Sequence, residues 1–132
     1  MKIVNVNVHK HDMQLKAPWA IAGRVTKSVQ NIFLEIQLSK DIKGVGSGAP
    51  SLGVTGENFT ASYKRLQSMA EKIIGWDIEN QNHILESLQS DLKDFPAARA
   101  AVDMALFDAL AKSEKTPLLE QLGKVHESFP TS

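Results

Sequence analysis

The chain has 132 residues, of which 42% are apolar, and its 15 basic and 15 acidic side chains cancel. A neutral chain without a basic cluster gives no electrostatic reason to expect nucleic acid or an anionic membrane as a partner. The chain has no cysteine, which excludes disulfides and thiolate metal sites. No stretch has the ~20 consecutive apolar residues of a membrane span or the apolar core of a signal peptide. We therefore expect one small cytoplasmic domain.

The first half of the chain has the alternation that is typical of strands. KIVNVNVHKHD (residues 2–12) predicts a strand with Val4, Val6 and Val8 on one face and Ile3, Asn5, Asn7 and His9 on the other. SVQNIFLEIQLS (28–39) alternates up to Leu38, and DIKGVGSG (41–48) predicts a third, short strand after a turn near Lys40–Asp41. Consecutive strands with short connections favour an antiparallel meander.

The second half has apolar residues at helical spacing. ENFTASYKRLQSMAEKII (57–74) and ENQNHILESLQSDLK (79–93) predict two amphipathic helices. Pro96 then opens an alanine-rich helix at its first turn, and PLLEQLG (117–123) predicts a last short helix that ends at Gly123. Strands followed by helices predict an α+β fold, a three-stranded antiparallel meander followed by a three- to four-helix bundle.

The alanine-rich helix is apolar on two sides. One stripe is Ala98, Ala101, Val102, Ala105, Leu106, Ala109 and Leu110, and the other is Ala100, Met104, Phe107 and Ala111. A three-stranded sheet and two other helices can bury one stripe, so we expect the second to meet a surface that this chain does not contain. A compact bundle with this helix at its centre is the alternative.

Residues that could carry chemistry are few. His9 and His11 have a spacing that could supply two metal ligands from a strand, but no third ligand is near in sequence, which favours exposed strand histidines. GVGSGA (44–49) matches part of a dinucleotide fingerprint, but Pro50 follows where a helix would have to start. We expect no catalytic and no metal-binding residue in this chain.

Two segments look like lid loops over a site for a small ligand. They are LKAPWAIAGRVTKS (15–28) and APSLGVTGE (49–57). Their large apolar and charged members that we take as candidate substrate-binding residues are Trp19, Ile21, Arg24, Leu52 and Val54. Exposed apolar side chains around one charge are typical of such lids. Two ordinary surface loops, with Trp19 packed on the sheet, are the alternative.

The chain also resembles a known family. The segments PWAIAGR, VQNIFLEIQL, KGVGSGAP, VTGE and AARAAVDMALFDALAK followed by TPLLEQLG are similar, in this order, to the N-terminal capping domain of the enolase superfamily. The match is to its muconate-lactonizing subgroup and covers essentially the whole chain. Arg24 falls where L-Ala-D/L-Glu epimerases and related dipeptide epimerases carry a substrate-binding arginine. Many members have G-x-G-E-A where this chain has Ser47 in place of the glutamate, so the resemblance leaves the substrate open.

The resemblance implies that residues 1–115 form the capping domain. Residues 116–132 would be a short helix and, at FPTS, the lead-in to a (β/α) catalytic barrel that this chain lacks. In the family a barrel lysine removes the proton next to a carboxylate, Mg²⁺ stabilises the enediolate, and a second lysine returns the proton. The capping loops exclude water from the active site and determine substrate specificity.

By this resemblance the parent protein is a Mg²⁺-dependent isomerase, most similar to a dipeptide epimerase, and the 132-residue chain alone is inactive and binds no metal. Arg24 would pair with a remote carboxylate of the substrate, to which its planar fork is suited. The remaining loop residues would shape the pocket. The expected partners are the protein's own barrel, a small dipeptide and further copies in a homo-oligomer. A muconate cycloisomerase or o-succinylbenzoate synthase-like member, and a stand-alone interaction module without enzymatic activity, are the alternatives.

Overall fold

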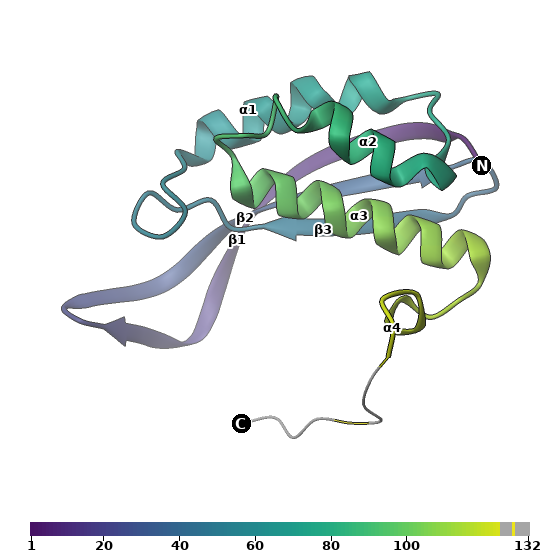
Figure 1. Cartoon of the computed structure of the whole chain (residues 1–132). Helices are drawn as coiled ribbons and strands as arrows, with labels where there is room; N and C mark the ends of the chain where they lie inside the picture. Colours follow the sequence, from purple (N-terminus) through teal and green to yellow (C-terminus); the bar gives the residue numbers. More distant parts are fainter. Residues whose placement is uncertain (125–127, 129–132) are drawn as a thin grey trace.

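The computed structural model describes residues 1–124 and 128, and the side chain of Ile21 lies outside the described part. Helices cover one face of a three-stranded sheet in the order β1–β2–β3 (Figure 1). The strands are β1 (Ile3–Ile21), β2 (Arg24–Leu38) and β3 (Lys43–Gly48). The helices are α1 (Phe59–Ala70), the 3-10 turns η1 (Glu71–Ile73) and η2 (Ile78–Asn80), α2 (Gln81–Leu88), α3 (Pro96–Glu114) and α4 (Leu118–Gln121). The predicted α+β order of an antiparallel meander followed by helices is confirmed.

The core lies between the sheet and the helices, and β2 runs through its middle. Ile32, Leu34, Ile36 and Leu38 are fully buried, whereas the residues between them are half-buried on the open face of the sheet. This is the alternation expected for a central strand with helices on one face only. Lys40 and Asp41 form the predicted turn to β3, both with positive φ.

The predicted face of Ile3 is wrong because β1 contains an irregularity near its start. The register shifts between Ile3 and Asn5, so β1 has one residue more than β2 over this step. Such a bulge reverses the alternation. Ile3 is therefore 1% exposed in the same core that Val6 and Val8 contact, and Val4 is exposed.

The segment 15–28 is not a loop, which corrects the prediction. β1 and β2 continue as a two-stranded ribbon that projects beyond the helices and closes at Ala22 and Gly23, both with positive φ (Figure 1). From Gln14 to Trp19 the ribbon uses five steps of β1 against two of β2. Pro18 lies in this irregular stretch, where its missing N–H costs no ladder hydrogen bond. The strand could not be recognised from the sequence, because its apolar residues are exposed and do not alternate, and because it contains a proline.

The alanines of α3 pack against the glycines of β3. A Cβ atom on Gly44, Gly46 or Gly48 would overlap backbone atoms of Ala105, Ala101 and Ala97, respectively. Two residues of a strand span about 6.7 Å and four residues of a helix about 6.0 Å, so a glycine at every second position meets an alanine at every fourth. The helix axis can therefore approach the strand closely.

The other side of α3 remains open among the described residues. Met104 is 50% exposed, Ala100 is exposed and Phe107 is half-buried, whereas Ala111 is buried. The predicted second stripe thus holds except at Ala111. The predicted lead-in FPTS (129–132) and His126 lie outside the described residues, and the described part contains no barrel. In the described part no helix is both long and apolar enough to cross a bilayer.

Candidate functional site

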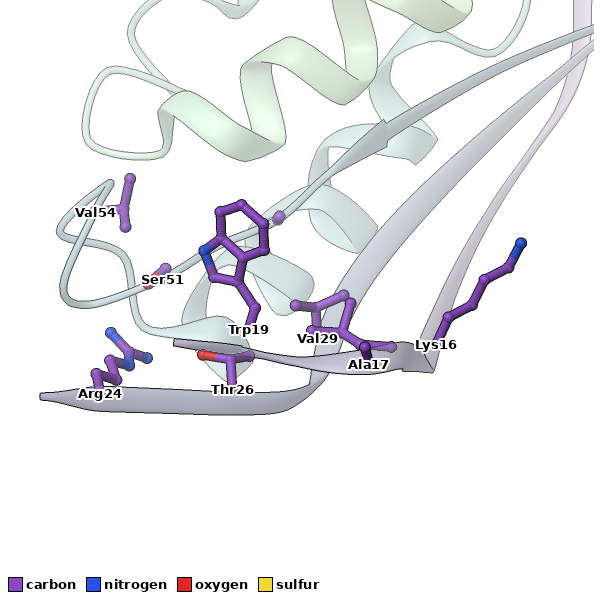
Figure 2. Close-up of a pocket in the computed structure, with 10 residues that line it drawn as sticks. Lys16, Ala17, Trp19, Arg24, Thr26, Val29, Ser51 and Val54 are labelled. Carbon is purple, nitrogen blue, oxygen red and sulfur yellow. The ribbon is translucent and has the colours of Figure 1, made fainter. Parts of the chain in front are cut away.

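The ribbon and the 49–57 loop, which are far apart in sequence, meet at one pocket. Its volume is about 530 Å³, within the range of small-molecule sites. It is lined by Leu15, Lys16, Ala17, Trp19, Arg24, Thr26, Val29, Ala49, Ser51 and Val54. Figure 2 shows Trp19 and Arg24 on the ribbon, facing the loop that carries Ser51 and Val54. Lys16 lies at the other end of the pocket, and its side chain points away from these residues (Figure 2).

A second hollow of about 500 Å³ adjoins the first on the loop side. Arg24 lines both, and Leu52 lines the second. The structure therefore brings together four of the five predicted residues, Trp19, Arg24, Leu52 and Val54. The fifth, Ile21, belongs to β1, but its side chain lies outside the described part.

Arg24 lies between the ribbon and the 49–57 loop and lines both hollows. It is the first residue of β2 after the ribbon turn and is exposed. Its Nη1 atom lies 3.0 Å from the position that a Cβ atom on Gly53 would take. Within the described chain no carboxylate is paired with Arg24, whereas several other surface cations, such as Lys43 and Lys72, form ion pairs. Its guanidinium is therefore available to a ligand.

The charges around the first pocket have one sign. Lys16 and Arg24 are its charged lining residues, and no aspartate or glutamate is among them. Trp19, Val29 and Val54 give it apolar walls, and Thr26 and Ser51 add hydroxyl groups. A small apolar pocket with the Arg24 guanidinium at its edge attracts a ligand that carries a negative group.

Glu57, which sequence reasoning treated only as the end of a loop, is a buried carboxylate next to this site. It is 2% exposed, and its two oxygens accept hydrogen bonds from the Ala97 amide (2.7 Å) and the Ser62 hydroxyl (2.9 Å). A signal existed in the sequence. Phe95 precedes the Pro96 helix and has no side-chain acceptor with which to cap it, so the cap had to come from elsewhere.

The described residues do not form a metal centre. No group of three or more His, Asp or Glu side chains in this part of the chain could hold an ion. His9 and His11 are exposed, as predicted, and the His11 ring contacts Phe33 edge-on. Glu35 is paired with Lys43, whose hydrogen bond lowers the pKa of the Glu35 carboxyl. These residues do not fit a magnesium site, and no acid–base pair is present at the pocket.

The chain is similar to curated epimerases over its full length. It is 39% identical to the L-Lys-D/L-Arg epimerase of Desulforapulum autotrophicum, an alignment that covers 100% of this chain and 38% of that protein. It is 32% identical to the L-Ala-D/L-Glu epimerase of Thermotoga maritima, over 98% of this chain and 37% of that protein. The chain thus spans less than two fifths of the length of these relatives.

A solved structure has the same fold. It is the dipeptide epimerase of Methylococcus capsulatus in complex with Mg and the dipeptide L-Arg-D-Lys, with a TM-score of 0.94 and 36% identity. It is matched over 100% of this chain and 38% of that chain. The family model of the mandelate racemase / muconate lactonizing enzyme N-terminal domain matches residues 3–123. The chain therefore belongs to the mandelate racemase / muconate lactonizing enzyme N-terminal domain family.

Proposed function

We propose that this chain is the substrate-specificity cap of a Mg²⁺-dependent isomerase that abstracts the proton next to a carboxylate, and that the parent enzyme is a dipeptide epimerase. The observation that carries the proposal is the convergence of the ribbon and the 49–57 loop on Arg24. This arrangement can bind and enclose a small ligand but offers no proton-transfer pair. Membership of the family and similarity to dipeptide epimerases support it.

The side chains of the dipeptide are a finer question, because the relatives are named for different substrates. These include L-Lys-D/L-Arg and L-Ala-D/L-Glu. The guanidinium of Arg24, which faces the loop, would repel a cationic side chain and attract a carboxylate. We therefore propose a dipeptide with an acidic second residue that pairs with Arg24. The apolar walls of the pocket would be formed by Trp19, Ile21, Leu52 and Val54.

The parent protein would supply the rest of the active site. The L-Lys-D/L-Arg epimerase is matched over only 38% of its length, and the magnesium ligands and catalytic lysines would lie in the corresponding remainder. We propose that this remainder also covers the open side of α3. Met104 of α3 is half exposed, and Leu119 of α4 and Leu122 after it are more than half exposed. Exposed apolar groups of this kind mark protein contacts. The cap then acts by closing the site against water.

The test is an assay of the full-length protein with a panel of dipeptides in deuterium oxide. We expect Mg²⁺-dependent exchange of one α-proton, appearance of the epimer, and loss of both when the metal is chelated. The 132-residue chain alone should give neither. Absence of exchange with every dipeptide would contradict the proposal. Turnover of a muconate or an o-succinylbenzoate precursor instead would assign the protein to another branch of the family.

A further inference from the structure

The 49–57 loop, which lines both pockets, is held at its two ends by the same residue of α3. At its start, Gly48 lies so close to Ala97 that a Cβ atom on the glycine would overlap the Ala97 carbonyl oxygen. At its end, Glu57 accepts a hydrogen bond from the Ala97 amide. The first turn of α3 therefore fixes where the loop begins and where it ends.

Burial of the Glu57 carboxylate costs free energy, because the group loses its contact with water. A buried carboxylate needs hydrogen-bond donors, and Glu57 receives them from Ala97 and Ser62. The N-cap residue Phe95 makes no side-chain bond, and Pro96 has no N–H, so the Ala97 amide is the first free donor of the helix. A serine at position 95 could cap this helix locally. The chain uses a carboxylate from the end of the loop instead.

The loop itself is a closed turn. The Ser51 amide donates to the Thr55 hydroxyl oxygen (3.0 Å), and the Thr55 amide donates to the Ser51 carbonyl (2.9 Å). Gly56, with a φ of 71°, joins this turn to Glu57. Because the turn is tied internally, residues 52–54 move with it, and its direction depends on the anchors at its two ends.

We infer that Glu57 is a positioning residue for substrate recognition, whose carboxylate fixes the second end of the 49–57 loop on α3 so that Leu52 and Val54 stand opposite Arg24. The inference rests on the proposed function, because it assigns the loop to the substrate pocket. In this role Glu57 acts through the loop. A cap that served only the stability of α3 would change kcat and not KM.

The first experiment is independent of activity. Hydrogen–deuterium exchange by mass spectrometry is measured on the full-length protein as wild type, Glu57→Ala and the control Ile73→Val. We expect Glu57→Ala to speed exchange about tenfold or more in peptides covering 49–57 and the first turn of α3, and to leave 32–38 unchanged. Ile73→Val removes a methyl group from a fully buried side chain of η1, outside the loop and α3, and should affect core peptides instead.

The second experiment is a kinetic comparison on a dipeptide that the wild type accepts. Displacement of the 49–57 loop weakens binding of the substrate and of the transition state alike. Glu57→Ala should therefore raise KM about tenfold with kcat nearly unchanged. A loss of folded enzyme alone would lower kcat and leave KM unchanged. Glu57→Gln keeps an oxygen for Ala97 and offers an N–H to Ser62, so it should restore most of the wild-type KM.

Three results would overturn the inference: unchanged exchange in 49–57 for Glu57→Ala, a fall in kcat alone, or a Glu57→Gln variant as impaired as Glu57→Ala. If the wild type epimerises no dipeptide, the proposed function fails. The role of Glu57 in holding the loop is then decided by hydrogen exchange, so the two failures are distinguishable.

Discussion

Two regions of the molecule differ in how closely their segments pack. We call them the helical end, where β3 meets α3, and the ribbon end, which consists of the β1–β2 ribbon and the 49–57 loop. At the helical end, β3 and α3 are in backbone contact, with glycines opposite alanines and little room for any other side chain. At the other end, the β1–β2 ribbon and the 49–57 loop leave Trp19, Leu52 and Val54 more than 60% exposed around two hollows. The first region can hold the fold with small residues because contact is close. The second can change its side chains at little cost to the fold.

We expect this difference to separate stability from specificity. A substitution at the helical end should act on the free energy of unfolding, and one at the ribbon end on ligand binding. Glu57 connects the two, because it is buried against α3 yet ends the exposed loop.

The largest effect is expected for Gly46→Ala. A Cβ atom there would lie well inside 3.0 Å of the Ala101 backbone, and backbone atoms cannot rotate away as a side chain can. We expect the free energy of unfolding to fall by about 3 kcal/mol or more, the upper end of the cost of overpacking. Chemical denaturation of the variant measures it.

The matched control is Gly53→Ala at the ribbon end. Its nearest neighbour would be the flexible end of the Arg24 side chain at 3.0 Å, which can move aside. We expect a change within about 0.5 kcal/mol. Equal losses of stability in the two glycine variants would contradict the contrast between the regions.

The next effect concerns Arg24 in the full-length protein. Loss of a desolvated, charge-assisted pair costs about 2–5 kcal/mol, or roughly a few tens to a few thousand fold in kcat/KM. Arg24→Ala should lose this much for acidic dipeptides such as Ala-Glu and much less for dipeptides with an apolar second residue. Exchange of the α-proton with solvent deuterium across a dipeptide panel measures it.

Lys27→Ala is the control for Arg24, because Lys27 is an exposed cation of the same ribbon that lines neither hollow. It should leave the preference across the panel unchanged, and both variants should unfold like the wild type. An identical substrate preference in wild type and Arg24→Ala would remove the argument for an acidic substrate.

Much of the helical end could be predicted from the sequence. Periodicity placed β2, α1 and α3, and the two apolar stripes of α3 indicated that one side would be covered by the sheet and the other left open. The contact between β3 and α3 could not be predicted, because the glycines at positions 44, 46 and 48 do not indicate which segment packs against them. Close contact is a property of two segments that are far apart in sequence.

The ribbon end was harder to predict. The segment 15–28 lost its alternation at the irregularity near Pro18 and exposed apolar residues along most of its length, so it resembled a loop. Trp19 and Arg24 nevertheless line the pocket together, and their role in binding a substrate stays a prediction. Glu57 was missed because its partners Ser62 and Ala97 come together only in the fold.

A smaller effect is expected on the open side of α3. In the 132-residue chain, the exposed side chains of Met104 on α3 and of Leu119 and Leu122 further along the chain should drive weak self-association, because exposed apolar groups favour contact with another copy. Met104→Asp places a charge on this surface and should weaken association roughly tenfold. Sedimentation velocity over a range of concentrations measures it. A wild-type chain that stays monomeric at the highest concentration would contradict this.

The smallest effect is expected at a surface ion pair of the helical layer. The Asp91 carboxylate accepts a hydrogen bond from Lys72 (2.6 Å), and this bond, with the nearby charges of Lys72 and Arg65, lowers the pKa of Asp91. A carboxyl whose pKa is lower in the folded state stabilises the fold fully above its unfolded pKa of about 3.9. That stabilisation is lost as the pH falls through the lower folded pKa.

Asp91→Asn removes this dependence, so the stability of the variant should match that of the wild type at the acid end and fall behind it as the pH rises past about 4. Urea unfolding at a series of pH values measures it, with Asp94→Asn, at an exposed carboxylate of the same segment, as the control. A gap between wild type and Asp91→Asn that is constant across pH would mean that packing, and not the ion pair, is what Asp91 contributes.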